Sequence, residues 1–202
     1  MTEDNENKHS NNRNNNKNLA KKRDFILNDD VSASSIKDII MGILEINRYD
    51  EEQLEKNEKY VRRPINLIVN TYGGSIYDGF ALVSVMDTSK TPVHTYCYGK
   101  AMSMGFLIFA IGHKRFAHPL ATFMYHNGAV GMHDDYKGLE YGLEQGKSIV
   151  AMGDRYITSI TNITQEKLDH YKERRQNWYM FAEEAFEYGL VDELLTSARQ
   201  VQ

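Results

Sequence analysis

The sequence contains few of the residues that cross-link, stiffen or anchor a chain. It has one cysteine, Cys97, and three prolines among 202 residues. A single cysteine cannot form an internal disulfide, which fits a reducing compartment, and we expect Cys97 to be a buried packing residue of a strand. No apolar run approaches the about 20 residues that a membrane-spanning helix needs, and residues 1–5 lack the apolar core of a signal peptide. These absences predict a cytoplasmic protein without a membrane anchor.

Strong charge of one sign is also absent. The chain has 24 Lys and Arg against 28 Asp and Glu, a net charge of −4. No basic stripe interleaved with aromatic residues is present, which argues against nucleic acid as a partner. His113, His118, His133 and His170 show no metal-ligand spacing with cysteine or acidic residues, so neither a metal nor another cofactor is predicted.

Short apolar segments alternate along the part of the chain that can form a core. Residues 1–22 are Asn-rich and aperiodic and are predicted to be a disordered tail, and 197–202 a second tail. The order between 23 and 196 follows a βαβ pattern, which predicts one α/β domain with a mainly parallel sheet. A charged stretch at 49–63 is predicted to be a solvated helix or loop. The expected strands are 23–27, 65–70, 93–98, 114–117 and 122–126. The first expected helix begins at a cap on Ser34 or Ser35, and three further helices are expected at 76–89, 106–112 and 134–162.

The turn around Ser103, in the segment GKAMSMG (99–105), points to a reactive serine. A nucleophilic serine needs a tight turn that exposes its hydroxyl and backbone N–H groups nearby, and glycines beside a helix start supply both. Taken alone, a serine between small residues is more often structural. Two further segments change that balance, because a strand ends in NTYGGS (70–75) and another delivers His126 in MYHNG (124–128).

Four blocks of the sequence, NTYGGS, AMSMGF, MYH and EYGLVD (187–192), follow one another in a specific order and spacing. In this arrangement the chain resembles the proteolytic subunit of the Clp protease, and its bacterial or phage-encoded relatives, over about residues 23–196. The resemblance implies a crotonase-like fold of repeated β-β-α units with a protruding handle helix at about 130–162. It also implies assembly into rings that enclose the active sites.

The same resemblance implies a serine endopeptidase that works through an acyl-enzyme. Ser103 matches the nucleophile and His126 the general base. Gly74 and Met104 match the residues whose backbone N–H groups form the oxyanion hole.

The third catalytic position departs from the common pattern of that family. Counting back from EYGLVD places Asn177 where the orienting aspartate usually stands. Replacing Asp by Asn in a trypsin-like triad costs about 10⁴ in rate, yet papain-like enzymes use Asn as their third residue. Asn177 is therefore the predicted third member, with Asp169, Glu173 and Asp192 as alternatives.

The resemblance implies peptides or unfolded proteins as substrates, homo-oligomeric heptamers or double rings, and a Clp-type ATPase as partner. The tail before Arg23 does not resemble an axial pore loop, so the ATPase is implied by the resemblance alone. Two other functions stay open: a weak or inactive subunit that co-assembles with a paralogue, and an acyl-CoA enzyme whose oxyanion hole stabilises an enolate. The presence of Ser103 and His126 favours the peptidase. Lys100 is a further candidate base, but an outward lysine on the turn is favoured.

Overall fold

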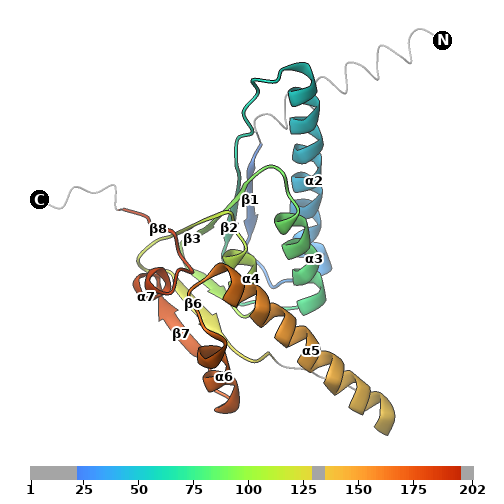
Figure 1. Cartoon of the computed structure of the whole chain (residues 1–202), viewed down its shortest axis with the longest axis vertical. Helices are drawn as coiled ribbons and strands as arrows, with labels where there is room; N and C mark the ends of the chain where they lie inside the picture. Colours follow the sequence, from blue (N-terminus) through green and yellow to red (C-terminus); the bar gives the residue numbers. More distant parts are fainter. Residues whose placement is uncertain (1–21, 129–134, 197–202) are drawn as a thin grey trace, which may run out of the picture.

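The computed structural model describes residues 22–128 and 135–196 (Figure 1). Apart from Lys22, both predicted tails lie outside these residues, as do the first residues of the predicted handle. Within the described ranges, no helix combines the length and the apolar character that a membrane crossing requires.

The larger sheet has five parallel strands in the order β1-β2-β3-β5-β8. These are β1 (Asp24–Leu27), β2 (Ile65–Val69), β3 (Val93–Cys97), β5 (Lys114–Ala117) and β8 (Glu193–Leu194). In β2 and β3 buried residues alternate with half-buried ones, because side chains of a strand point to opposite faces of the sheet. The predicted parallel sheet is confirmed, and its first strand is an edge strand.

A smaller sheet of three strands carries the residues on either side of the candidate site. Its order is β4-β6-β7, with β4 (Lys100–Met102) parallel to β6 (Thr122–Tyr125) and β7 (Trp178–Phe181) antiparallel to β6. The sequence patterns did not predict β4 or β7. In β7, Trp178 and Met180 are buried while Tyr179 and Phe181 are exposed, so the aromatic run is a strand with one buried face.

The predicted start of the first helix is wrong. Helix α2 (Ala33–Lys56) is capped by Ser32, whose hydroxyl accepts the backbone N–H of Ser35. The hydroxyl of Ser35 in turn accepts the backbone N–H of Ser32, which completes a capping box. The helix continues into the charged stretch at 49–63 as far as Lys56. Within that stretch Asp50 is fully buried and accepts from Arg23 Nη1 at 2.9 Å, so the predicted solvation is wrong at this residue.

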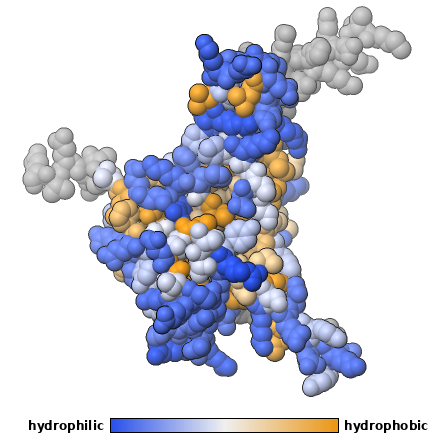
Figure 2. Space-filling model, viewed as in Figure 1, coloured by the Kyte–Doolittle hydropathy of each residue, from blue (hydrophilic) through white to orange (hydrophobic). Residues whose placement is uncertain are grey.

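The described residues form five further helices. They are α3 (Ile76–Asp87), α4 (Met104–Ala110), α5 (Tyr136–Ile160), α6 (Gln165–Glu173) and α7 (Ala182–Glu187). Figure 1 shows α5 projecting away from the body, as the resemblance implies for a handle. Figure 2 shows a hydrophilic surface over α6 and hydrophobic residues toward the centre of the same face.

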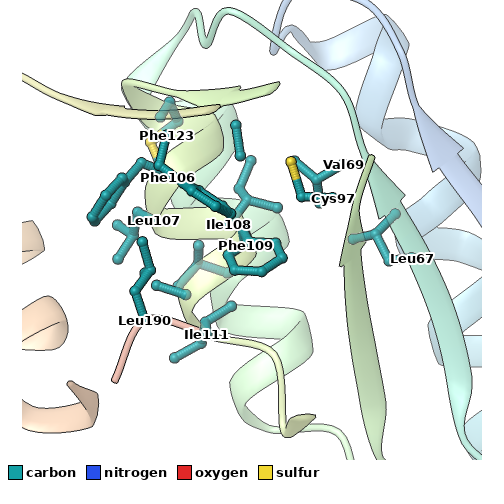
Figure 3. Close-up of a cluster of buried hydrophobic side chains, with 14 of the residues drawn as sticks. Leu67, Val69, Cys97, Phe106, Leu107, Ile108, Phe109, Ile111, Phe123 and Leu190 are labelled. Carbon is teal, nitrogen blue, oxygen red and sulfur yellow. The ribbon is translucent and has the colours of Figure 1, made fainter. Parts of the chain in front are cut away.

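Helix α4 is the centre of the hydrophobic core, since all seven of its residues are buried. Phe109 packs against Phe123 of β6 with ring centroids 4.9 Å apart (Figure 3). Cys97 at the end of β3 is fully buried, and burial raises the pKa of its thiol to about 12. Cys97 therefore packs in the core, as predicted, and its thiol is not a nucleophile near neutral pH.

Candidate active site

The backbone of Ser103 takes a conformation that few residues other than glycine adopt. Its φ is 53° and its ψ is −121°, in the turn between β4 and α4. Such geometry costs on the order of 1–3 kcal/mol and persists only where neighbouring structure imposes it. Here the Ser103 N–H donates to Met124 O at 2.8 Å. The turn presents the hydroxyl at the start of α4.

The hydroxyl of Ser103 meets the imidazole of His126, the predicted partner. Ser103 Oγ and His126 Nε2 are 2.7 Å apart. The pairing of β4 with β6 brings the two side chains together. Met102 lies opposite Met124, and Ser103 and His126 are the residues that directly follow β4 and β6. Burial lowers the pKa of His126, so the ring is neutral near pH 7 and can accept the hydroxyl proton.

The Gly-Gly turn lies directly against the Ser103 turn. Val31 N donates to Gly73 O at 2.7 Å and Ser75 N donates to Val31 O at 2.8 Å, which fixes the loop on both sides of Gly74. A Cβ on Gly73 would lie 2.7 Å from Ser103 Cβ, and the φ of Gly73 is +109°. Only glycine fits this close approach.

Two backbone N–H groups beside Ser103 have no backbone acceptor among the described residues. One belongs to Gly74, whose neighbours on both sides bond Val31. The other belongs to Met104, the first residue of α4, where a helix offers N–H groups without intrahelical partners. These are the two residues predicted for the oxyanion hole, and that role stays a prediction that the geometry supports.

An apolar pocket opens beside Ser103 and His126. Its wall comes from α3, α4 and α5 and from the end of β6. The residues that line it are Ile76, Phe80, Ser103, Met104, Leu107, Tyr125, His126, Asn127, Gly128, Ile149, Val150, Gly153, Asp154 and Ile157. Sequence reasoning missed Tyr125 and Asp154. The available signal was an acidic residue on the apolar face of α5, three positions before the buried Ile157.

The structure does not join Asn177 to the other two catalytic candidates. Its side chain is exposed, and its Nδ2 donates to Tyr179 Oη at 3.5 Å. The β6–β7 ladder pairs Tyr125 with Trp178, so Asn177 is one step beyond it and opposite His126. Asn177 thus lies near His126 in the register, but no hydrogen bond joins the two side chains among the described contacts, and its catalytic role stays a prediction.

Carboxylates do not replace Asn177 within the described residues, none of which hydrogen-bonds His126 through an acidic side chain. Of the alternatives named above, Asp169 accepts from Lys172 Nζ at 2.6 Å. Asp192 binds Arg115 Nη2 at 2.6 Å. The pKa of His126 agrees with this, because burial lowers it and no acid among the described residues raises it.

Lys100, the other candidate base, contacts an aromatic ring. Lys100 Nζ lies 4.3 Å from the centre of the Tyr72 ring, a cation–π contact at the surface. This agrees with the predicted outward orientation of Lys100.

Over the described ranges, no three His, Cys, Asp or Glu side chains are grouped so that they could hold a metal ion.

Known proteins share the sequence pattern and the fold described above. The family model described as Clp protease matches residues 7–198. The chain belongs to the Clp protease family. The ATP-dependent Clp protease proteolytic subunit of Deinococcus radiodurans is 29% identical over 187 residues, covering 90% of this chain and 84% of that protein. The structure of an Asn-to-Asp variant of ClpP1 from Listeria monocytogenes superposes with a TM-score of 0.74 at 18% identity, over 90% of this chain and 96% of that one. The predicted family and its α/β fold are thereby confirmed.

Proposed function

We propose that this Clp protease family member is a serine peptidase subunit that hydrolyses peptide bonds through an acyl-enzyme. The observation that carries the proposal is the 2.7 Å contact between Ser103 Oγ and His126 Nε2. The contact lies at the start of α4, where N–H groups have no backbone acceptor among the described residues, and beside an apolar pocket. The nucleophile and the base are thus in contact, and the predicted oxyanion donors Gly74 and Met104 lie next to the two turns that meet at Ser103, which supports acyl transfer at this site.

The chemistry follows from these positions. Ser103 Oγ attacks the peptide carbonyl carbon while its proton passes to His126 Nε2. The carbonyl oxygen gains negative charge and accepts the N–H groups of Gly74 and Met104, each of which is worth about 10²- to 10³-fold in rate. His126 then gives the proton to the leaving amine, which departs and leaves an ester on Ser103. A water molecule, deprotonated by His126, hydrolyses the ester and regenerates the serine.

The pocket beside the nucleophile supports a preference for peptides with an apolar side chain next to the cleaved bond. Leu107, Ile149 and Ile157 line its apolar wall. Burying such a side chain contributes about 1.5–3 kcal/mol. As in the family, we propose ring assembly around the active sites, unfolded proteins as substrates, a Clp-type ATPase as the partner that delivers them, and a cytoplasmic location.

A serine-reactive fluorophosphonate probe tests the proposal directly. Purified assembled protein is treated with the probe and the adduct is located by mass spectrometry. We expect an adduct on Ser103 in the wild type and none in Ser103→Ala, with hydrolysis of an apolar peptide lost in the same variant. An assembled wild-type protein that forms no Ser103 adduct and cleaves no peptide contradicts the proposal.

A second candidate, a catalytically weak subunit that assembles with a paralogue, is favoured by one observation. Asn177 is exposed and bonds Tyr179 instead of His126. The Asn177→Asp variant separates the two candidates. A wild type that labels measurably, and faster as Asn177→Asp, is an intact but slow peptidase. A wild type that does not label, beside an Asn177→Asp variant that does, is the weak subunit.

A further inference from the structure

We propose that Tyr125, held by Asp154 and Lys172, is the positioning residue that keeps His126 in register with Ser103. This inference rests on the proposed peptidase function. Its starting point is that no carboxylate among the described residues bonds His126, whereas a catalytic imidazole must be held in one orientation. Some other part of the chain must therefore supply that restraint.

Tyr125 is attached to three parts of the molecule at once. Its backbone is the last residue of β6 and directly precedes His126. Its ring packs edge-on against Phe106 of α4, the helix that directly follows Ser103, with centroids 6.1 Å apart. Its hydroxyl donates to Asp154 Oδ1 of α5 at 2.6 Å. One side chain thus links the base, the nucleophile's helix and the handle.

Asp154 is a buried acceptor for that hydroxyl, and other side chains hold its carboxylate in place. It is 2% exposed, and its Oδ2 accepts from Lys172 Nζ of α6 at 2.6 Å and from Gln165 Nε2 at 3.5 Å. Lys172 also binds Asp169 of the same helix at 2.6 Å. A largely buried ion pair contributes little net stability compared with apolar residues of similar size, so the presence of Asp154 in the pocket wall, paired with Lys172 behind it, calls for another role.

The network is attached to the residue before His126 and to the helix that precedes Asn177. Burial and the neighbouring Asp154 carboxylate raise the pKa of the Tyr125 hydroxyl, which therefore stays protonated and donates at every pH of interest. Lys172 holds α6, whose end leads into the segment with Asn177 opposite His126. A displacement of a catalytic group by about 1 Å can cost about 10²-fold in rate. A restraint on the residue before His126 is therefore expected to have a large effect on the rate.

The first test is Tyr125→Phe, which removes only the hydroxyl. We expect kcat for an apolar peptide to fall by about tenfold with KM unchanged, because the pocket keeps its ring while the base loses its restraint. Tyr141→Phe is the matched control, since Tyr141 is an exposed tyrosine of α5, and it should behave as wild type. A rise in KM with unchanged kcat would make Tyr125 a substrate contact and overturn the proposal.

A pair of double variants separates positioning from stability. Asp154→Asn with Lys172→Met keeps an acceptor for the Tyr125 hydroxyl, whereas Asp154→Leu with Lys172→Met has the same charge and no acceptor. We expect the Asn version to keep kcat within about threefold of wild type and the Leu version to fall about tenfold, like Tyr125→Phe. Equal kcat values for the two double variants, at equal thermal stability and assembly, would overturn the proposal.

A chemical readout makes the inference independent of turnover. Diethylpyrocarbonate modifies neutral imidazoles, and the bond to Ser103 protects His126 Nε2. We expect modification of His126, measured by mass spectrometry against the exposed His113, to be several-fold faster in Tyr125→Phe and in the Leu double variant. If wild-type protein forms no Ser103 adduct but this difference is present, the peptidase fails and the positioning role stands. If His126 reacts equally in all variants, the positioning role fails.

Discussion

The turn that carries Ser103 and the segment that carries Asn177 are held in opposite ways. Around Ser103 the backbone is fixed by bonds between distant segments, such as Met102 N to Thr71 O at 3.1 Å and Ser103 N to Met124 O at 2.8 Å. Before Asn177, Arg175 and Gln176 bond only the preceding helix, with Arg175 N to Lys172 O at 3.1 Å. Non-local backbone contacts thus build the nucleophile and base within one chain, whereas the chain enters Asn177 from α6 through local bonds and its non-local pairing begins only at the next residue, Trp178 of β7.

The largest effect should come from breaking the well-held region at Gly73. In Gly73→Ala the added Cβ would lie 2.7 Å from Ser103 Cβ and 2.8 Å from Met102 O, at a φ of +109°. The Ser103 turn must shift, and we expect the rate of Ser103 labelling to fall by about 10²-fold or more, as for loss of an oxyanion donor.

The control for that variant is Gly142→Ala in the interior of α5, where alanine suits the helix better than glycine by roughly 0.5–1 kcal/mol. Its labelling rate should match wild type. Labelling of Gly73→Ala at the wild-type rate, measured on folded and assembled protein, would show that the close approach of the two turns is not needed.

The next effect sharpens the comparison at Asn177. A carboxylate opposite His126 would stabilise the imidazolium that forms as Ser103 attacks, so Asn177→Asp should accelerate labelling by about tenfold or more. Because Asn177 makes no bond to His126 here, Asn177→Ala should change the rate by less than about threefold. A loss in Asn177→Ala as large as that of His126→Ala would show instead that Asn177 already orients the base.

The smallest effect is a shift in pH dependence. His126 must be neutral to take the proton, so the labelling rate falls as pH drops through its pKa. Burial lowers that pKa, and no acid in the described part of the chain raises it, so the midpoint for wild type should lie below the ordinary value of about 6.5. In Asn177→Asp the added negative charge raises the pKa and should move the midpoint upward. Labelling rates measured between about pH 5 and pH 8 give both midpoints, and a wild-type midpoint above that of Asn177→Asp contradicts this assignment.

Sequence patterns predicted the fold well where hydrophobic periodicity is local. The strand at Lys114–Ala117 has the predicted bounds, and the helix from Ile76 ends within a few residues of its prediction. The cap at Ser32 was missed because three neighbouring serines offer the same chemistry, and only the geometry selects one. The strand Trp178–Phe181 was missed because its aromatic residues have the composition of a core segment of either type.

The candidate site shows the same limit. Ser103 and His126 could be named because each lies in a distinctive turn after an apolar strand. The contact of Tyr125 with Asp154 and that of Asp154 with Lys172 join residues on three different elements, 29 and 18 positions apart. No periodicity in the sequence encodes such a meeting, since it depends on how α5 and α6 pack behind β6.

The burial of Cys97 has a practical consequence for following this molecule in solution. With the only thiol of the chain enclosed in the core and its pKa near 12, maleimide reagents will leave the native protein unmodified. A cysteine introduced at the exposed Tyr141 would then be the sole attachment point for a fluorophore. The handle helix can in this way carry a reporter of subunit association without removal of a native residue from the core.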